Sequence, residues 1–381
     1  MTNPFVYGEV VPASAFVDRE AELDRLTSDL RDGQKIFLIS PRRYGKSSLV
    51  RQALGSAARG GAITVEVTVS SYSSYVAFLE GYARALVAGE SRLDRARNWL
   101  RELLTDPRPE VRLEADPAGR RQLAVSFPSV RTDKDASRLA HEVFALPGRM
   151  AEARKRRLAI ALDEFQAIGA FNGGSVEHAL RAAVQHQREV GYVFSGSEPA
   201  LMERMLGRNR PFYKAGPVMR LQKIPADRFA QFIEAKLKAT GIKSTPGVAA
   251  AIVELAGNLP YDVQRLAHEV WDDVKAGGGR TADLDVLHAT LKRLLGEHDS
   301  LFEGTWQRLT LAQRGALRAA VLEEGVELLS ADVRARYRLS GTSTVQASLS
   351  ALVREDILAR EGPRYTVVDS LFREWVARRT F

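Results

Sequence analysis

The segment SPRRYGKSS, residues 40–48, decides the fold of this protein. It follows a short apolar run at residues 35–39, which predicts a buried strand, and it precedes a stretch through residue 54 that predicts a helix. A loop between a strand and a helix presents backbone N–H groups to an anion. The segment fits the phosphate-loop pattern G-x-x-x-x-G-K-[ST] except at its first position, where Ser40 replaces glycine.

The residue types in this loop have predicted roles in binding ATP and Mg²⁺. Lys46 would bridge the β- and γ-phosphates, and Ser47 would place its hydroxyl on Mg²⁺. Gly45 lets the backbone approach a phosphate with no Cβ in the way. A serine at position 40 is costly only if that position requires a positive φ. We therefore predict that the nucleotide contacts the whole loop: Ser40, Pro41, Arg42, Arg43, Tyr44, Gly45, Lys46, Ser47 and Ser48.

A second motif is an apolar run at residues 158–162 that ends in Asp163 and Glu164. A buried parallel strand would deliver both carboxylates to the sheet edge where ligands bind in α/β folds. Asp163 would hold Mg²⁺, usually through water. Glu164 would act as the general base that polarises the attacking water.

A third polar site follows another predicted strand, at residues 193–197. Ser195 or Ser197 could contact the γ-phosphate or the attacking water, and Ser197 is the preferred candidate. The alternative is a polar turn that caps the helix predicted over residues 199–206.

The order of the elements predicts an α/β fold followed by helices. Strands over residues 62–67, 158–162, 192–195 and 218–221 are separated by helical stretches, which predicts a parallel sheet covered on both faces. After residue 225 the periodicity is helical, and the last part shows a helix, a helix-turn-helix and a hairpin, the order of a winged helix. The predicted domains are a core at 1–225, a helical domain at 226–303 and a winged helix at 304–381.

The length and composition of the chain exclude several classes of protein and of functional site. A chain of 381 residues is too long for one ordinary domain, and the absence of cysteine excludes disulfides and cysteine nucleophiles. No apolar run reaches the ~20 residues of a membrane span, and residues 1–10 do not resemble a secretion signal. We expect a cytoplasmic protein with no membrane partner.

The net charge of +8 is concentrated in one region. Residues 91–157 carry 16 basic and 10 acidic side chains, a net charge of +6, and look like an insertion. This region is either a solvated surface or a place where nucleic acid binds, with Arg120 and Arg121 as candidates.

Several segments together resemble the archaeal-type P-loop ATPases, a group near the STAND and AAA+ families and the origin-recognition ATPases. The resemblance covers nearly the whole chain and is weakest at residues 91–157. It rests on NPFVYG (3–8), FVDREAEL (16–23), PRRYGKSSL (41–49), DEFQ (163–166), GNLPYDVQRL (257–266) and two winged-helix segments, 343–346 and 365–375.

The resemblance implies an AAA+-like parallel sheet of order 5-1-4-3-2, a helical lid over residues 226–303, and ATP bound between sheet and lid. It implies that the adenine lies near residues 3–7 and 16–20, and that a lid arginine reaches the γ-phosphate. It also implies a finger arginine that acts on a neighbour's ATP in a homo-oligomer. The corresponding residues here are Phe5, Tyr7, Phe16 and Arg19 for the adenine, Pro260 and Arg265 in the lid, and Arg208 or Arg210 for the finger.

Two positions depart from the family pattern, Ser40 and Asp18, which both stand where the family usually has glycine. Neither departure removes a charge that the chemistry needs. A solvated surface remains the alternative reading for each of the three arginines.

The winged helix could bind double-stranded DNA or a protein partner. Its net charge is only +3, from 12 basic and 9 acidic residues over 306–381, and strong DNA binders show a clearer basic face. Three functions stay open: an ATP-hydrolysing switch associated with DNA, a STAND-type signalling or defence regulator that binds protein, and a nucleotide-binding module with little turnover. The DNA-contact candidates are Ser343, Thr344, Gln346, Arg354, Arg360 and Arg364.

Overall fold

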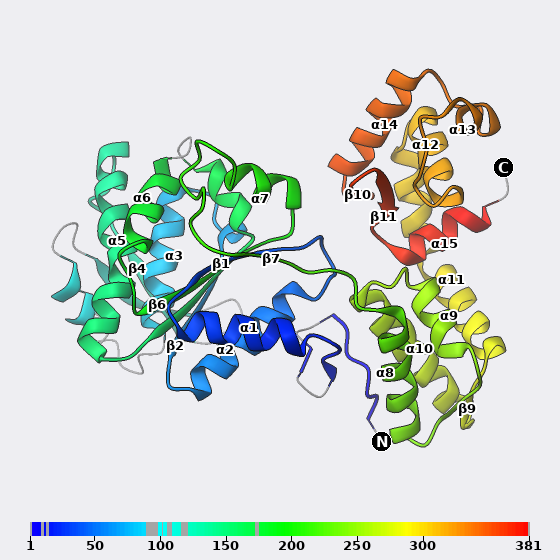
Figure 1. Ribbon diagram of the computed structural model, residues 1–381, viewed down its shortest axis with the longest axis horizontal. Coiled ribbons are helices and arrows are strands. Elements are labelled where there is room, and N and C mark those ends of the chain that lie inside the picture. The colour runs from blue at the N-terminus through cyan, green and yellow to red at the C-terminus, as the bar shows by residue number, and fades with distance from the viewer. Residues whose placement is uncertain are drawn as a thin grey trace. The chain divides into compact units, whose positions relative to one another are not determined.

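The chain forms two compact units, shown in Figure 1. The computed structural model describes residues 2–8, 11–12, 15–88, 98–100, 102–104, 109–115, 121–171 and 175–379. One unit comprises Arg19–Gln222, and the other combines Met1–Asp18 with Lys223–Phe381. The N-terminal segment therefore belongs to the same unit as the C-terminal helices.

The first unit is built on a parallel sheet. Its strands lie in the order β2-β5-β6-β1-β7, which confirms the predicted order 5-1-4-3-2. The inner strands β5 and β6 are buried along their whole length, as expected for a sheet that is covered on both faces. The strands are β1 (Lys35–Ile39), β2 (Ile63–Thr68), β5 (Leu158–Asp163), β6 (Val190–Gly196) and β7 (Val218–Arg220).

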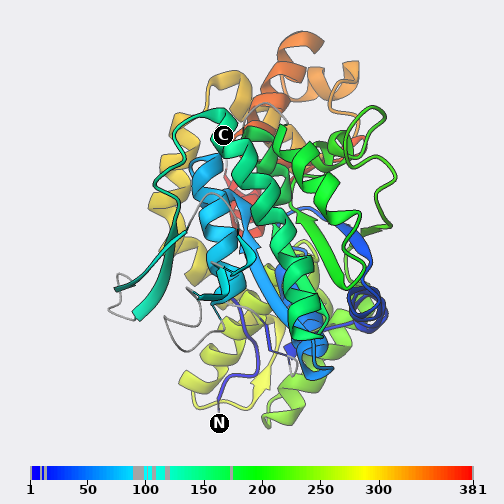
Figure 2. The same cartoon turned by 90° about the vertical axis from the view of Figure 1, so that its left-hand side faces the viewer.

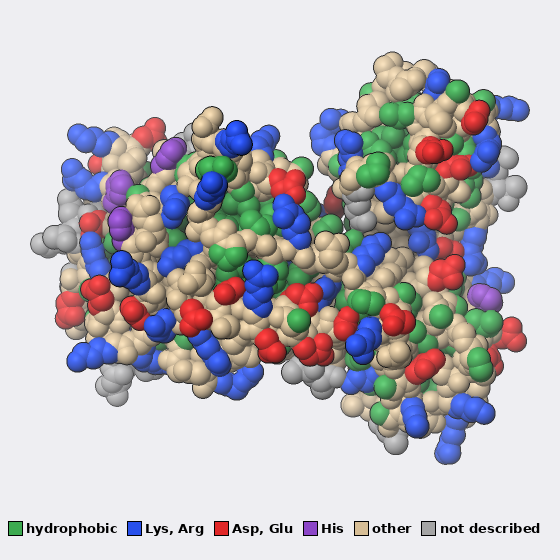
Figure 3. Space-filling view, in the orientation of Figure 1, with side chains coloured by type: hydrophobic (Ala, Val, Ile, Leu, Met, Phe, Trp, Pro, Cys, Tyr) green, Lys and Arg blue, Asp and Glu red, His purple; other side chains and the backbone are tan. Residues whose placement is uncertain are grey.

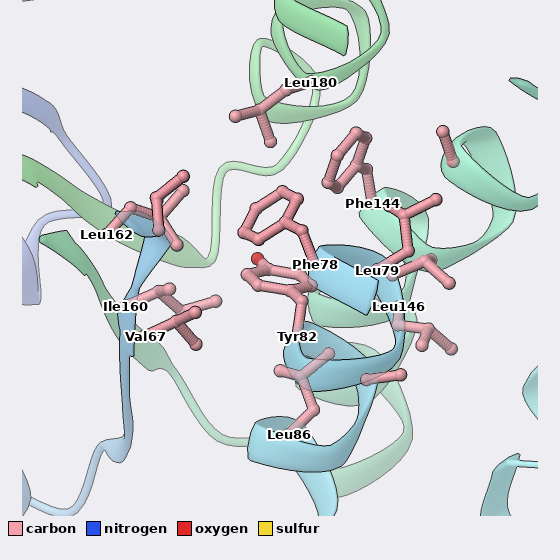
Figure 4. Packing of buried hydrophobic residues seen from close by; sticks show 14 of the residues in the cluster. Val67, Phe78, Leu79, Tyr82, Leu86, Phe144, Leu146, Ile160, Leu162 and Leu180 are labelled. Carbon is pink, nitrogen blue, oxygen red and sulfur yellow. The ribbon is translucent and has the colours of Figure 1, made fainter. Parts of the chain in front are cut away.

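The two faces of this sheet pack against different helices. Large and small side chains alternate along β5 and point to opposite faces, so the helices on the side of the small residues can approach more closely. On β5, Leu158, Ile160 and Leu162 enter a large core with α3 (Tyr75–Val87) and α5 (Asp133–Arg154). Figure 4 shows the rings of Phe78 and Tyr82 on α3 beside Ile160 and Leu162. On the other face, alanines let two helices approach closely: α1 (Glu20–Arg31) and α2 (Lys46–Arg59).

Residues 91–157 contribute both to the core and to the surface. The helix α5 buries Leu139, Val143 and Phe144 and packs against α3 and α6 (Ser175–Val184), so it is an integral cover of the sheet. A hairpin of β3 (Glu110–Ala115) and β4 (Arg121–Ser126) extends away from the sheet, as Figure 2 shows.

The second unit begins with a group of helices that share one core with the N-terminal segment. Phe5 is fully buried in this core, where its ring lies 6.3 Å from the ring of Phe232. Asn3 and Tyr7 donate hydrogen bonds to the helix over residues 260–276. The elements are α8 (Ala226–Ala239), β8 (Lys243–Ser244), α9 (Val248–Leu255), α10 (Pro260–Ala276), β9 (Thr281–Ala282) and α11 (Leu284–Arg308).

The C-terminal elements have the expected winged-helix order and are joined to α11. This helix runs through the predicted domain boundary at residue 303, and Phe302 packs 5.4 Å from Phe372 of the last helix. Arg373 also donates to the carbonyl oxygens of Glu254 and Leu255 at the end of α9. The elements are α12 (Leu311–Leu322), α13 (Ala331–Arg336), α14 (Thr342–Arg354), β10 (Leu358–Glu361), β11 (Arg364–Val367) and α15 (Ser370–Arg378).

No helix in the described ranges is both long enough and apolar enough to span a membrane.

Candidate functional site

The SPRRYGKSS loop connects β1 to α2 and leaves the first turn of α2 facing into it. Gly45 precedes α2 with a φ of 83°, in the left-handed region that glycine adopts without strain. A Cβ added at Gly45 would meet no atom within 4 Å, so in the chain itself the backbone angle is what requires glycine. Because glycine brings no capping side chain, the first N–H groups of α2 can stabilise an anion.

Ser40 occupies the first position of the loop without backbone strain. Its φ is not among the positive angles of the described residues, so a serine can replace the glycine of the general pattern there. The backbone N–H of Ser40 donates to the carbonyl of Gly196 at 3.3 Å, which joins the loop to β6. The Ser40 side chain is buried, and its hydroxyl has no hydrogen-bond partner among the described residues.

Asp163 lies at the centre of a group of polar side chains from three strand ends. Its Oδ1 accepts hydrogen bonds from the Lys46 ammonium and, at 2.6 Å, from the Ser195 hydroxyl. Its Oδ2 accepts from the Ser47 hydroxyl at 3.2 Å. Burial alone would raise the pKa of Asp163, but the charge of Lys46 and the hydrogen bonds from Lys46 and Ser195 outweigh it and hold that pKa below its ordinary value.

Glu164 follows directly and is held by a second set of partners. Its backbone adopts a φ of 50°, which turns the chain out of β5 into the short 3₁₀ helix Phe165–Ala170. One carboxylate oxygen, Oε1, lies 3.5 Å from the Lys46 ammonium. The other, Oε2, accepts hydrogen bonds at 2.6 Å from both Ser197 and Gln166.

The structure therefore brings together Lys46, Ser47, Asp163, Glu164 and Ser197, as the sequence motifs suggested. It adds Ser195, which the strand pattern offered only as the second choice, and Gln166, to which no role was given. The signal for Gln166 was its place in the DEFQ segment, two residues after the candidate base.

The donor set at Ser47 and Asp163 fits a magnesium ion. Both side chains offer oxygen atoms, and Asp163 favours its ionised form, which Mg²⁺ requires. Within the described ranges no three His, Asp or Glu side chains form a metal site of their own. Mg²⁺ is commonly held by one or two carboxylates together with substrate phosphates.

Of the two finger candidates, Arg210 has a partner inside its own unit. It donates at 2.8 Å to Glu177 of α6, whose side chain is fully buried. Burial raises the pKa of Glu177 above its ordinary value, and Arg210 acts against that rise. Arg208 is exposed on the same loop.

We expect the Arg210→Ala variant to lower the free energy of unfolding by about 1–3 kcal/mol, because it leaves the buried Glu177 carboxylate without its cation. Because the Arg210 side chain is 42% exposed, water screens part of its attraction to Glu177. Urea denaturation at neutral pH measures the change. Adding Glu177→Gln should restore most of the loss, while Arg208→Ala should change stability by less than about 0.5 kcal/mol. Equal losses in Arg208→Ala and Arg210→Ala would contradict the pairing.

The other candidates for the nucleotide's base and γ-phosphate fall in both units. Arg19 is buried in the sheet unit, where it contacts the Gln222 carbonyl and Glu22. In the second unit, Arg265 donates to His298 Nε2 at 2.8 Å, since His298 Nδ1 donates to the Leu294 carbonyl. The remaining candidates also belong to the second unit: Phe5 in the core, Tyr7 donating to Glu269 at 2.9 Å, Phe16 half-buried, and Pro260 as the first residue of α10.

The candidate DNA contacts on the winged helix differ in exposure and in whether another side chain already binds them. Ser343, Thr344 and Arg354 are exposed on α14. Gln346 donates to the Tyr365 hydroxyl at 3.3 Å, and Arg360 lies over the Tyr365 ring. Arg364 is bound to Glu324 at 2.8 Å. On the face shown in Figure 3, basic and acidic side chains are interspersed.

Two arginines of the basic region before β5 bind backbone carbonyl groups of the same unit. Arg156 donates to the Gly61 carbonyl at 2.9 Å, and Arg157 donates to the Arg31 carbonyl at 2.6 Å. Arg120 lies outside the described residues, as does the side chain of Arg121.

Comparison with solved structures identifies the fold. The Walker-type ATPase Paby2304 of Pyrococcus abyssi superposes with a TM-score of 0.62, covering 97% of this chain and 99% of its own, at 15% identity. The fold is that of a P-loop ATPase. The same P-loop ATPase fold relates this chain to the ORC2 protein of Aeropyrum pernix in ADPNP–ADP complexes, with a TM-score of 0.56, 13% identity and coverage of 98% and 95%.

A further similar structure is the ORC1 protein of Aeropyrum pernix in complex with DNA, with a TM-score of 0.53, 14% identity and coverage of 96% and 94%. Residues 300–378 match the family described as "Probable winged helix domain", which confirms the predicted C-terminal fold. No curated protein sequence matches this chain.

Proposed function

We propose that this protein binds ATP together with Mg²⁺ and hydrolyses it, as a nucleotide-driven switch. The observation that carries the proposal is the convergence of Lys46, Ser47, Asp163 and Glu164 beside the loop that opens α2. Phosphate oxygens suit the loop N–H groups and the Lys46 ammonium. The ADPNP–ADP complexes of the ORC2 protein, which shares the fold, support a nucleotide ligand.

In the proposed reaction each residue has one task. Lys46 holds the β- and γ-phosphates, and Ser47 and Asp163 hold Mg²⁺, which neutralises charge on the phosphates when it is bound. Glu164 accepts a proton from the water that attacks the γ-phosphorus, and the bond to the β,γ-bridging oxygen breaks to release ADP and phosphate. The unstrained Ser40 favours this function over a binding module that lacks turnover.

Magnesium-dependent release of phosphate from ATP is the direct test. We expect phosphate release that is lost when EDTA is added. Tight ADP binding with no release of phosphate would instead support the binding module.

A second candidate function is contact with double-stranded DNA through α14. The exposed face of this helix carries small uncharged polar residues, Ser343 and Thr344, which can reach base edges. The ORC1 protein in complex with DNA has the same fold, which supports the proposal. The alternative is a protein partner.

We expect duplex DNA to bind weakly and with a shallow salt dependence, because Arg354 is the only basic residue within α14 and Arg364 is already paired with Glu324. Fluorescence anisotropy at 50 and 200 mM salt measures the affinity, and the ATPase rate with and without DNA measures coupling. Replacing Thr344 with glutamate should weaken binding, while Glu234→Gln on exposed α8 serves as the control. DNA that neither binds nor changes the ATPase rate would favour a protein partner.

A further inference from the structure

Two hydrogen-bond donors hold the Glu164 carboxylate at Oε2, the oxygen that is not the one paired with Lys46. Ser197, just after β6, and Gln166, in the 3₁₀ helix Phe165–Ala170, both donate to Oε2 at 2.6 Å. The Gln166 amide nitrogen also lies 3.5 Å from the Ser197 hydroxyl and 3.4 Å from a carboxylate oxygen of Glu198. With Oε2 occupied, Oε1 is the oxygen left facing Lys46, at 3.5 Å.

Gln166 is anchored so that its amide stays at this carboxylate. The neighbouring residues Phe165 and Ile168 are fully buried, which fixes the short helix from which Gln166 projects. A side chain with a rigid base and an amide N–H donor can hold a carboxylate oxygen in one position.

Gly196 provides the room that the Gln166 amide occupies. A Cβ added there would lie 2.7 Å from Gln166 Oε1 and 2.5 Å from Met202 Sδ. The φ of Gly196 is not positive, so the backbone would accept alanine and only these neighbours exclude it. Glycine at the end of β6 is therefore explained by the position of Gln166 and Met202.

The orientation of the amide carries a cost that packing alone does not explain. Gln166 Oε1 is buried and has no hydrogen-bond partner among the described residues, which is unfavourable because a buried polar atom has lost its water without gaining a partner. Rotating the amide by half a turn would place its carbonyl oxygen against the Glu164 carboxylate, so the charge of Glu164 dictates the costly orientation. An apolar side chain of similar length would avoid this cost.

We propose that Gln166 is a positioning residue for the general base: with Ser197, it fixes the Glu164 carboxylate so that one oxygen is presented for catalysis. This inference rests on the proposed function. It predicts that loss of the Gln166 amide slows the chemical step while nucleotide binding is preserved, since Lys46 and Ser47 are untouched.

The test compares kcat and KM in two variants that disturb the amide differently. Gln166→Met removes the donor and keeps the length, and Gly196→Ala keeps the donor but displaces it. Both should lower kcat about 10–100-fold, the effect of a misplaced catalytic group, with the KM for ATP and the affinity for ADP unchanged. If Gln166→Met does not fold, Gly196→Ala decides the question, since it retains every polar side chain.

Tyr192→Phe is the matched control. It removes a buried hydroxyl from β6, the strand that also contains Gly196. This hydroxyl donates to Gln187 and lies 3.5 Å from the Tyr82 hydroxyl, and neither partner belongs to the polar group around Asp163 and Glu164. It should cost stability and leave kcat unchanged. An equal fall of kcat in Tyr192→Phe would mean that the effects are only structural, and it would overturn the inference.

Glu164→Gln, measured in parallel, separates the two proposals. If Glu164→Gln loses turnover while Gln166→Met and Gly196→Ala keep it, or turn over faster, the positioning role is wrong and the base assignment stands. If Glu164→Gln keeps full turnover, the base assignment fails and the positioning role fails with it.

Discussion

The Lys46→Ala variant is expected to lose most nucleotide binding, with the dissociation constant for ATP raised by about 30-fold or more. The Lys46 side chain is only 5% exposed, and its ammonium faces both Asp163 and Glu164 at the mouth of the phosphate loop. In the proposed complex this ammonium pairs with the phosphates, and removing one partner of a buried charge pair costs about 2–5 kcal/mol, which corresponds to about 30-fold to several thousand-fold in affinity. Isothermal titration calorimetry with ATP and with ADP measures the loss.

The same substitution should also lower the stability of the nucleotide-free protein, because Asp163 would keep its buried charge without the ammonium that compensates it. Lys134→Ala, at an exposed position of α5, is the matched control and should change neither affinity nor stability. ATP affinity within a few-fold of wild type in Lys46→Ala would show that the phosphates bind elsewhere.

The Glu164→Gln variant is expected to bind ATP normally and to hydrolyse it about 10²–10⁴-fold more slowly, the contribution of a general base. The amide has the same shape, and its carbonyl oxygen can still accept from Ser197 and Gln166, so the surroundings should stay in place. What the variant loses is the capacity to take a proton from water. Single-turnover phosphate release, together with the ATP dissociation constant, separates the two effects.

Glu203→Gln is the control for this experiment. It removes a carboxylate from α7 (Pro199–Met205) that is exposed and paired only with Arg220, at 3.2 Å, in the contacts of the described residues. Its kcat should equal that of wild type. Undiminished hydrolysis in Glu164→Gln would require a different base.

The strands β1, β5 and β6 could be predicted because each is largely a short apolar run, whereas β2 and β7 are less apolar; the motif resemblance supplied the order of all five. The helices α1 and α5 were harder to predict. Residues of α5 lie in the strongly charged region 91–157, and Pro147 inside the helix argues locally against a helix at that point. Packing of Val143, Phe144 and Leu146 in the core outweighs that local preference.

In the candidate site, too, some features could be predicted from the sequence and others appeared only in the folded chain. The strand pattern offered Ser197 as the preferred candidate and Ser195 as the second choice, although residues two apart on a strand point to the same side. In the folded chain both serines donate hydrogen bonds, Ser195 to Asp163 and Ser197 to Glu164. Arg210 was a candidate finger arginine, with a solvated loop as the alternative, and its partner Glu177 lies 33 positions away in the sequence.

Local sequence determined the elements and the chemistry of the loop, because apolar periodicity, a strand-to-helix turn and the order of Gly45, Lys46 and Ser47 are properties of neighbouring residues. Only the folded chain decided which oxygen of Glu164 is occupied, why Gly196 has no side chain, and why Ser40 can stand in for glycine. These depend on distances between strand ends that are far apart in the chain, and sequence spacing does not contain such distances.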